Sequence, residues 1–353
     1  MKIAIDIGPI SEKNISGHKV RGVGSYIASL KDSLARYDKS NTYAFFSRRK
    51  DIPRDIDVVH YPYFEPFFLS LPLFKKAKTV VTIHDLTPIV FPKDFPVGIK
   101  GFLKWQVQKI ALKSVDAILT DSVISKKDIV SILNIPDKKV FVVHLSADNV
   151  FKKILVSKDS KNKLLKKYNL PEKFGLYVGD ATANKNLPRL IDAIIGGSVP
   201  LVMVGKALSE TATDTNSWNR DLVIVQNKIK NNPLFFPIGF VSSEDLVLLY
   251  NCATFLIMPS LYEGFGLPIL EAMKCGCPVI TTKEGSIPEI AGDSAFYVDA
   301  YSVANISEGV KKVFDSEVVR QDLSRMGLAQ ASKFSWEKTA EATIKVYGAS
   351  IKK

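Results

Sequence analysis

The chain has 353 residues, of which 46% are hydrophobic and 24% are charged, as in an ordinary globular protein. This length exceeds what one hydrophobic core usually organises, so we expect two domains. No segment approaches the roughly 20 apolar residues of a membrane-spanning helix, and we expect no signal peptide in the opening MKIAIDIGPI. Cys275 and Cys277 are separated by a single residue, and the third cysteine makes the number odd. This pattern excludes a disulfide framework or a zinc site and favours a reducing cytoplasm.

Positive charge is concentrated in the first part of the chain. The formal net charge is +12, and residues 1–150 contain 23 lysines and arginines against 15 aspartates and glutamates. Such a basic segment is typical of a protein that meets an anionic partner, for example a phospholipid surface or a polyprenyl phosphate. No recognition motif supports nucleic acid as the partner.

Strand-like and helix-like segments alternate in chain order. Short apolar runs that predict buried strands occupy residues 2–8, 42–46, 57–61, 79–85, 117–122 and 139–145, and residues 23–37 and 100–115 have helical patterns. After a lysine-rich stretch at 157–170 the alternation resumes at residue 174 and continues to residue 282. Repeated alternation predicts two α/β domains with doubly wound parallel sheets, and a ligand in the cleft at the strand carboxyl ends.

Residues 263–280, EGFGLPILEAMKCGCPVI, contain two glutamates on either side of a predicted helix start. Pro268 is permitted in the first turn of a helix and Gly276 is a natural stop. The N–H groups of a helix start favour phosphate, whereas a glutamate binds hydroxyls. Glu263 and Glu271 are therefore suited to hold sugar hydroxyls on the two sides of a diphosphate. The alternative is a surface loop followed by an ordinary helix, and the spacing alone does not decide between them.

The segment 239–299, GFVSSEDLVLLYNCATFLIMPSLYEGFGLPILEAMKCGCPVITTKEGSIPEIAGDSAFYVD, resembles the C-terminal domain of retaining, nucleotide-sugar-dependent glycosyltransferases of family 4. RGVGSYI, TIHDL, YVGDATANKN and SWEKTAEATIKVY follow in the family's order. The resemblance implies a GT-B fold of two Rossmann-like domains that face a central cleft. It implies an acceptor-side domain at 1–150, a linker at 151–172, a nucleotide-sugar domain at 173–334, and a final helix at 335–353 that packs back on the first domain.

The resemblance also assigns roles to single residues around the second domain's glycine loop. Glu263 matches the glutamate near the donor sugar hydroxyls, and Glu271 matches the one on the nucleotide ribose. The backbone N–H groups of Phe265, Gly266 and Leu267 would meet the diphosphate.

Three further positions match the family's pattern, and one departs from it. Lys185 matches the basic residue that neutralises the departing diphosphate, although a solvated lysine is the alternative. Gly22 belongs to the glycine loop that closes over the phosphates, and His84 matches the histidine that touches the donor sugar. Many relatives carry arginine where this chain has Asp180. We expect Asp180 to turn away from the diphosphate, or to pair with Lys185 or Arg189.

The implied reaction is retaining transfer of a sugar, with mannose from GDP-mannose as the first candidate, to a saccharide or lipid-linked acceptor in cell-surface glycan synthesis. The acids at 55–57 look like a metal pair, but a solvated turn is the favoured interpretation, so we expect no required metal or other cofactor. The alternatives are a nucleotide-sugar epimerase of similar fold and a non-catalytic sugar-nucleotide-binding protein.

The helix at 100–114 carries a second hypothesis. Leu103, Val107 and Ile110 share one face, which we expect in the core. A second face, with Trp105 and Lys109 among its residues, mixes aromatics and lysines. Either neighbouring helices bury that face, or it contacts an anionic membrane surface peripherally, which would be the inner face.

Overall fold

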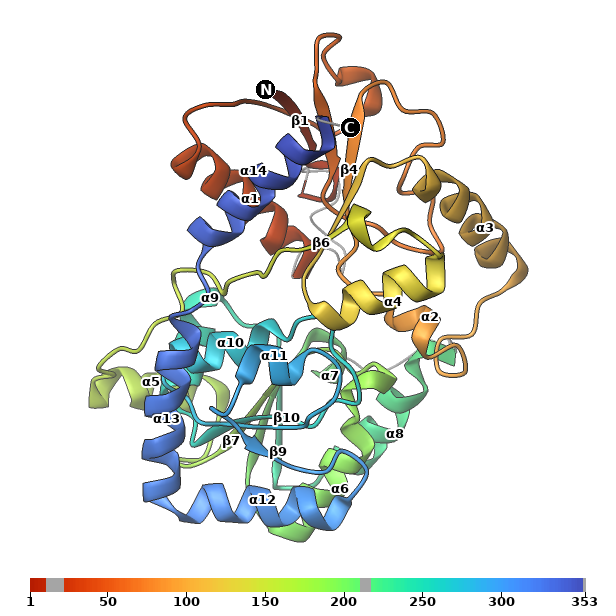
Figure 1. Ribbon diagram of the computed structural model, residues 1–353. Coiled ribbons are helices and arrows are strands. Elements are labelled where there is room, and N and C mark those ends of the chain that lie inside the picture. Colours follow the sequence, from red (N-terminus) through yellow and green to blue (C-terminus); the bar gives the residue numbers. More distant parts are fainter. Residues whose placement is uncertain (11–21, 210–216, 352–353) are drawn as a thin grey trace. The chain divides into compact units, whose positions relative to one another are not determined.

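The computed structural model describes residues 1–10, 22–209 and 217–351, which form two compact units (Figure 1). The first unit contains Met1–Pro92, Val97–Ser146 and Phe334–Lys353, and the second contains Lys93–Pro96 and Ala147–Lys333. Each unit is built around one six-stranded sheet with parallel pairing. The stretch 151–172, which we expected to be a linker, includes a helix and belongs to the second unit.

The sheet of the first unit has the strand order β2-β1-β3-β4-β5-β6. Its central strands are fully buried apolar runs, as expected where helices cover both faces of a parallel sheet. The last helix, α14, packs against α1 in this unit. The strands are β1 (Lys2–Asp6), β2 (Thr42–Phe46), β3 (Val58–Tyr61), β4 (Lys78–Thr82), β5 (Ala117–Thr120) and β6 (Val140–Val142); the helices are α1 (Gly22–Tyr37), α2 (Thr87–Val90), α3 (Ile99–Lys113), α4 (Val123–Leu133) and α14 (Trp336–Ile351).

The sheet of the second unit has the order β12-β11-β10-β7-β8-β9. Its middle strands are again continuous apolar runs, and α6 and α12 pack against each other beside it. The strands are β7 (Gly175–Val178), β8 (Leu201–Val204), β9 (Phe235–Gly239), β10 (Phe255–Met258), β11 (Val279–Thr281) and β12 (Phe296–Tyr297). The helices are α5 (Lys158–Tyr168), α6 (Leu187–Gly197), α7 (Lys206–Ser209), α8 (Arg220–Ile229), α9 (Ser243–Cys252), α10 (Leu267–Lys274), α11 (Ile287–Ala291), α12 (Val303–Asp315) and α13 (Glu317–Ala331).

Helix α3 faces the core with a different side from the one we expected. Leu103 and Ile110 are 57% and 60% exposed, whereas Trp105 is buried. The reason is Gln108, a buried polar residue at the centre of the inner face: its amide accepts from the Leu71 N–H at 2.9 Å and donates to the Leu71 carbonyl at 3.1 Å. A satisfied amide can occupy a buried position, and the apolar periodicity of the sequence does not reveal that.

Candidate active site

Lys185 and Glu263 form an ion pair at the carboxyl edge of the second sheet, in which Glu263 is buried and Lys185 is half-buried. Lys185 follows β7 and Glu263 follows β10, and these two strands are neighbours, so their ends meet. The Lys185 ammonium donates to both carboxylate oxygens of Glu263 at 2.8 Å. The Ser260 hydroxyl donates to the same carboxylate at 2.6 Å. Glu263 is only 6% exposed. Its charge is compensated by the bonds from Lys185 and Ser260, as a buried charge must be.

Two asparagines on either side of Lys185 fix the loop that carries Glu263. The Asn184 amide donates to the Tyr262 carbonyl at 3.0 Å, and the Asn186 amide donates to the Pro259 carbonyl at 2.9 Å. Both asparagines are buried. The segment NKN therefore ties the ends of β7 and β10 together while the lysine between the asparagines reaches the carboxylate.

Gly285, after β11, holds the backbone of Glu263 from the other side. It has φ +59°, and a Cβ added there would lie 2.8 Å from the Glu263 nitrogen and 2.9 Å from its carbonyl oxygen. The Ser286 N–H donates to that oxygen at 3.1 Å. Only glycine fits both the left-handed conformation and this close approach.

Helix α10 begins directly after the Glu263 loop. Gly266 caps it with φ 95°, no side chain forms a cap hydrogen bond, and Pro268 is in the first turn. The positive end of the helix dipole thus lies a few residues after Glu263 in the sequence, and no carboxylate or hydroxyl side chain caps it. The assignment of the Phe265, Gly266 and Leu267 N–H groups to a diphosphate stays a prediction.

Glu271 lies further along α10 and is electrostatically unusual. Burial raises its pKa to about 7, although the hydroxyl of Tyr250, which donates to Oε2 at 2.9 Å, lowers it. The Asp148 carboxylate raises the pKa further and Lys274 lowers it. A carboxyl group with this pKa is partly protonated near neutral pH.

His84 lies in the first unit, where it pairs with an aspartate from the next strand. His84 follows β4, Asp121 follows β5, and the His84 Nδ1–H donates to the Asp121 carboxylate at 2.7 Å. Burial is the largest influence and acts to lower the pKa of His84, but the charge and hydrogen bond of Asp121, together with smaller contributions from Asp85 and Pro62, outweigh it and the net shift is upward. Nε2 is buried without a hydrogen bond of ordinary geometry among the described residues, although the Pro62 carbonyl contributes to the raised pKa. This nitrogen is the atom that a ligand hydroxyl could satisfy.

Gly22 is the first residue of α1, and the residues before it in the glycine loop lie outside the described ranges, as does His18. One turn later, Tyr26 packs edge-on against His84 with ring centroids 4.7 Å apart. His60 is a core residue: its ring nitrogens lie 2.7 Å from the Tyr347 hydroxyl and 2.8 Å from Thr82 Oγ1. Burial lowers its pKa to about 3, so it is neutral.

Comparison with known proteins decides the family. The model of "Glycosyl transferases group 1" matches residues 160–330, and that of "Glycosyltransferase Family 4" matches residues 14–149. O-antigen chain mannosyltransferase B of Escherichia coli is 30% identical over 82% of this chain and 75% of its own length. The chain belongs to the family 4 glycosyltransferases. The serotype-specific mannosyltransferase WbdA of Escherichia coli is also 30% identical, over 76% of this chain but only 33% of its own length.

The fold of this glycosyltransferase is GT-B, with two parallel α/β sheets. Sucrose-phosphate synthase from Thermosynechococcus elongatus superimposes with a TM-score of 0.74 at 17% identity, over 99% of this chain and 98% of that one. The family implies a nucleotide-sugar donor and a saccharide acceptor.

Asp180 does not pair with either cation that we named for it. Its side chain is exposed, and its carbonyl accepts from the Tyr177 hydroxyl at 2.6 Å. Lys185 binds Glu263 instead, and Arg189 donates to Asn186 Oδ1 at 2.8 Å. The first alternative, in which Asp180 turns to solvent, agrees with this exposure.

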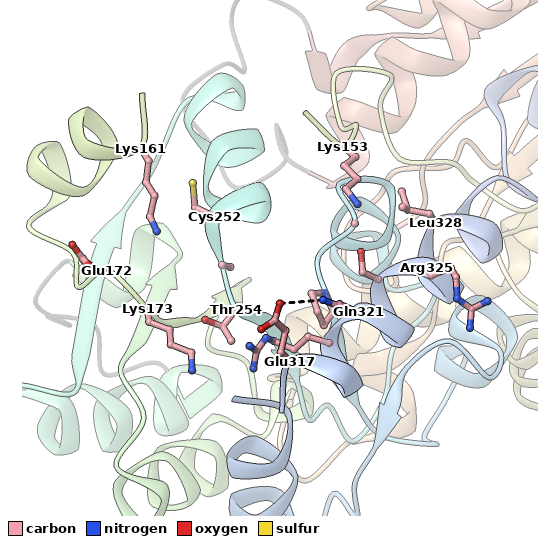
Figure 2. A pocket seen from close by; sticks show the side chains of 15 residues that line it. Lys153, Lys161, Glu172, Lys173, Cys252, Thr254, Glu317, Gln321, Arg325 and Leu328 are labelled. Atoms are coloured by element: carbon pink, nitrogen blue, oxygen red, sulfur yellow. Dashed lines mark hydrogen bonds between the residues drawn. The ribbon is translucent and has the colours of Figure 1, made fainter. Parts of the chain in front are cut away.

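A basic hollow of about 710 Å³ lies elsewhere in the glycosyltransferase (Figure 2). The hollow is at the amino edge of the second sheet, because its lining includes Lys173, two residues before β7, and Thr254 and Pro278, which directly precede β10 and β11. Ligands of open parallel sheets bind at the carboxyl edge, where Lys185 and Glu263 lie. We therefore do not assign the donor to this hollow.

Sequence reasoning missed two members of the site, Asp121 and Ser260. Asp121 directly follows β5, the neighbour of the strand β4 that ends before His84, and Ser260 lies two residues after the end of β10. Neighbouring strand ends were thus a usable signal for Asp121. The hydrogen bond from the Ser260 hydroxyl to Glu263 depends on how the loop after β10 folds back, and the spacing of residues in the sequence does not predict that.

Proposed function

We propose that this glycosyltransferase transfers mannose from GDP-mannose, with retention of configuration and without a required metal or other cofactor, to a saccharide or lipid-linked acceptor in cell-surface glycan synthesis. The observation that carries the proposal is the Lys185–Glu263 pair beside the start of α10, where no side chain caps the helix. It combines a cation for the diphosphate with a carboxylate for sugar hydroxyls at one sheet edge.

The proposed chemistry uses the charges of this edge. As the bond between the sugar's anomeric carbon and the diphosphate oxygen breaks, Lys185 and the N–H groups at the start of α10 stabilise the charge that develops. The acceptor oxygen attacks from the same face, and its proton passes to the departing phosphate oxygen. Glu263 is engaged by Lys185 and Ser260, which supports a binding role for this carboxylate over a nucleophilic one.

Mannose is the first candidate because the two relatives described above are named mannosyltransferases. The name of the first also mentions an O-antigen chain, which supports a saccharide acceptor in a surface glycan. The three cysteines are free thiols, and the cytoplasm remains the predicted compartment.

The test is thermal stabilisation by GDP, UDP, ADP and their sugar conjugates in EDTA, followed by transfer from the donor that binds. Ligand at about 100 times its dissociation constant adds roughly 2.7 kcal/mol of stability. We expect the largest shift with GDP-mannose and its loss in Glu271→Ala. Glu308→Ala is the matched control, since Glu308 is an exposed glutamate of α12.

Four results would contradict parts of the proposal. Stabilisation by a nucleotide with another base would contradict GDP-mannose as the donor. Stabilisation only after a divalent metal is added would contradict the proposed independence of metal. Product of inverted configuration would overturn retention. Turnover of donor to an isomeric nucleotide sugar without any acceptor would favour the epimerase alternative.

A further inference from the structure

The basic hollow of the second unit has no part in the proposed reaction. Its volume of about 710 Å³ is in the range of pockets that hold small molecules, roughly 300 to 1,000 Å³. Its lining contains two glutamates, of which Glu317 accepts from the Gln321 amide at 3.0 Å. Five cations line it as well: Lys153, Lys161, Lys173, Arg320 and Arg325. A concave site of this size with an excess of positive charge is suited to an anionic small molecule.

The three lysines of the basic hollow have no carboxylate partner. In the described part of the chain, no ion pair involves Lys153, Lys161 or Lys173. The Lys173 ammonium instead lies 4.0 Å from the ring centroid of Phe314. Figure 2 shows Lys161 and Lys173 on one side of the hollow and Lys153 on the other. Positive charges on both sides attract an anion into the space between them.

Two hydroxyl groups line the basic hollow without a hydrogen bond among the described residues. They belong to Thr254, directly before β10, and to Ser324 of α13. A Cβ added at Gly276 would lie 3.2 Å from Ser324 Oγ and 3.1 Å from Lys153 Cδ, so this hydroxyl and this lysine flank the same glycine. Phosphate oxygens accept from ammonium and hydroxyl groups alike, and lysine is a common phosphate ligand.

The walls of the basic hollow are fixed by hydrogen bonds to the backbone. Asn251, near the end of α9, accepts from the Ile154 N–H at 2.9 Å and donates to the Lys152 carbonyl at 3.1 Å, which holds the segment that carries Lys153. Arg320 donates to two carbonyls near the end of α12, at 2.9 and 2.6 Å. A ligand that enters a hollow with fixed walls has to order little of the chain.

We propose that the basic hollow binds a small molecule that carries two or more phosphate groups. The volume is much larger than one phosphate, and cations on opposite sides of it can each meet a separate phosphate group. The site is distinct from the donor site, because the hollow is at the amino edge of the second sheet and Lys185 and Glu263 lie at the carboxyl edge. The proposal does not depend on the proposed function.

The experiment is isothermal titration calorimetry of the full chain in EDTA with inorganic tripolyphosphate, glucose 1,6-bisphosphate and orthophosphate. Tripolyphosphate joins its phosphates in a chain and the bisphosphate separates them, so the tighter of the two shows which arrangement the hollow takes. One variant is Lys153→Gln/Lys161→Gln, which removes a charge from each side. A second is Thr254→Val, which removes a hydroxyl and keeps the shape of the side chain.

Two further variants are controls. Lys166→Gln/Lys311→Gln removes the same charge from exposed lysines of the second unit that do not line the hollow. Lys185→Ala alters the donor site and leaves the hollow unchanged. Melting temperatures of the hollow variants that equal the wild-type value without ligand would show that these variants are folded.

We expect tripolyphosphate or the bisphosphate to bind the wild type and both controls with equal affinity. The lysine variant should bind at least about tenfold more weakly, since one hydrogen bond to a charged group is worth about a factor of ten or more. Thr254→Val should bind several-fold more weakly. Orthophosphate should bind the wild type at least about tenfold more weakly than the better probe.

Four results would overturn the proposal. They are no binding of either multiphosphate probe, equal affinity of the lysine variant and the wild type, an equal loss in Lys166→Gln/Lys311→Gln, and orthophosphate binding as tight as that of the better probe. Loss of binding in Lys185→Ala alone would place the phosphates at the donor site instead. Tighter binding of hexaglutamate than of both probes would replace the small molecule by an acidic protein segment.

Discussion

The Lys185 ammonium lies 2.8 Å from each carboxylate oxygen of Glu263, which is buried in the second unit. The cation expected on the diphosphate and the acid expected on the sugar are therefore direct partners. Such a pair keeps two charges in place at the sheet edge before donor binds, so the binding step need not pay the full desolvation of either group.

Removing one member of this pair should affect both stability and catalysis. In Lys185→Ala the buried carboxylate keeps Ser260 as its one side-chain partner among the described residues, and breaking a buried pair costs roughly 3 kcal/mol of unfolding free energy. Loss of the cation should also lower kcat/KM by about 10² to 10³. Urea unfolding and initial rates measure the two effects.

The double variant Lys185→Ala/Glu263→Gln should recover much of the stability and none of the activity. Lys311→Ala, at an exposed lysine of α12, should change neither. If Lys185→Ala unfolds at the wild-type urea concentration, the pair is screened by solvent and the argument for a buried charge fails.

Gly285 should tolerate no side chain. In Gly285→Ala the left-handed backbone costs of order 1 to 3 kcal/mol, and the new Cβ must displace the backbone of Glu263. We expect a less stable protein with a higher KM for donor. In contrast, Gly348→Ala in α14, with open space at its Cβ, should gain about 0.5 to 1 kcal/mol. A fully active Gly285→Ala would mean that the Glu263 loop moves freely.

The alternation of strands and helices was predictable because parallel strands in a covered sheet are continuous apolar runs, as in β8 and β10. The turn into α10 was predictable for a different reason. Gly266 and Gly276 both have positive φ, and their local chemistry marks the start and end of the helix without any tertiary information.

Features that depend on tertiary contacts were not predictable. The expected orientation of α3 was wrong because Gln108 is buried, where its amide bonds the N–H and the carbonyl of Leu71. An analysis of apolar periodicity places a glutamine on the outer face of a helix. The run 221–225, DLVIV, has β-branched residues typical of a strand but lies in α8, where Leu222 and Val225 are buried. The Lys185–Glu263 bond joins residues 78 positions apart, and only the strand order brings them together.

Glu271 should make stability fall as pH rises. Its pKa is about 7 in the folded chain against an ordinary value of 4.5, so the folded state holds the proton more tightly. Stability is therefore highest below pH 4.5 for this group and is lost as pH rises toward 7. Glu271→Gln keeps an acceptor for Tyr250, removes the titration, and should melt at a higher temperature than wild type at pH 8.

The same carboxylate, if it binds the ribose, must be ionised to accept two hydroxyls well. Nucleotide affinity of the wild type should consequently weaken as pH falls below 7, and Glu271→Gln should bind weakly at every pH. Melting curves at pH 5 and pH 8, with and without GDP, check both statements. Equal stabilisation by GDP at the two pH values would remove Glu271 from the ribose site.

Asp121 should control the protonation of His84. In Asp121→Asn the charge that raises the pKa of His84 is gone, while burial, which lowers it, remains. A raised pKa in the folded state stabilises the wild type below the ordinary pKa of 6.5, and this contribution is lost as pH rises through the folded value. We expect Asp121→Asn to lose that acid-side stability and to lower the His84 pKa measured by NMR.

If protonated His84 donates from Nε2 to the donor sugar, the pH dependence of activity should change together with the His84 pKa. The upper limb of the kcat/KM profile would then move to lower pH in Asp121→Asn, with little change in KM for the nucleotide. Asp85→Asn is the control, because Asp85 contributes a smaller upward shift and also accepts from the Thr87 N–H. An unchanged pH profile in Asp121→Asn, together with a lowered His84 pKa, would assign the pair to folding alone.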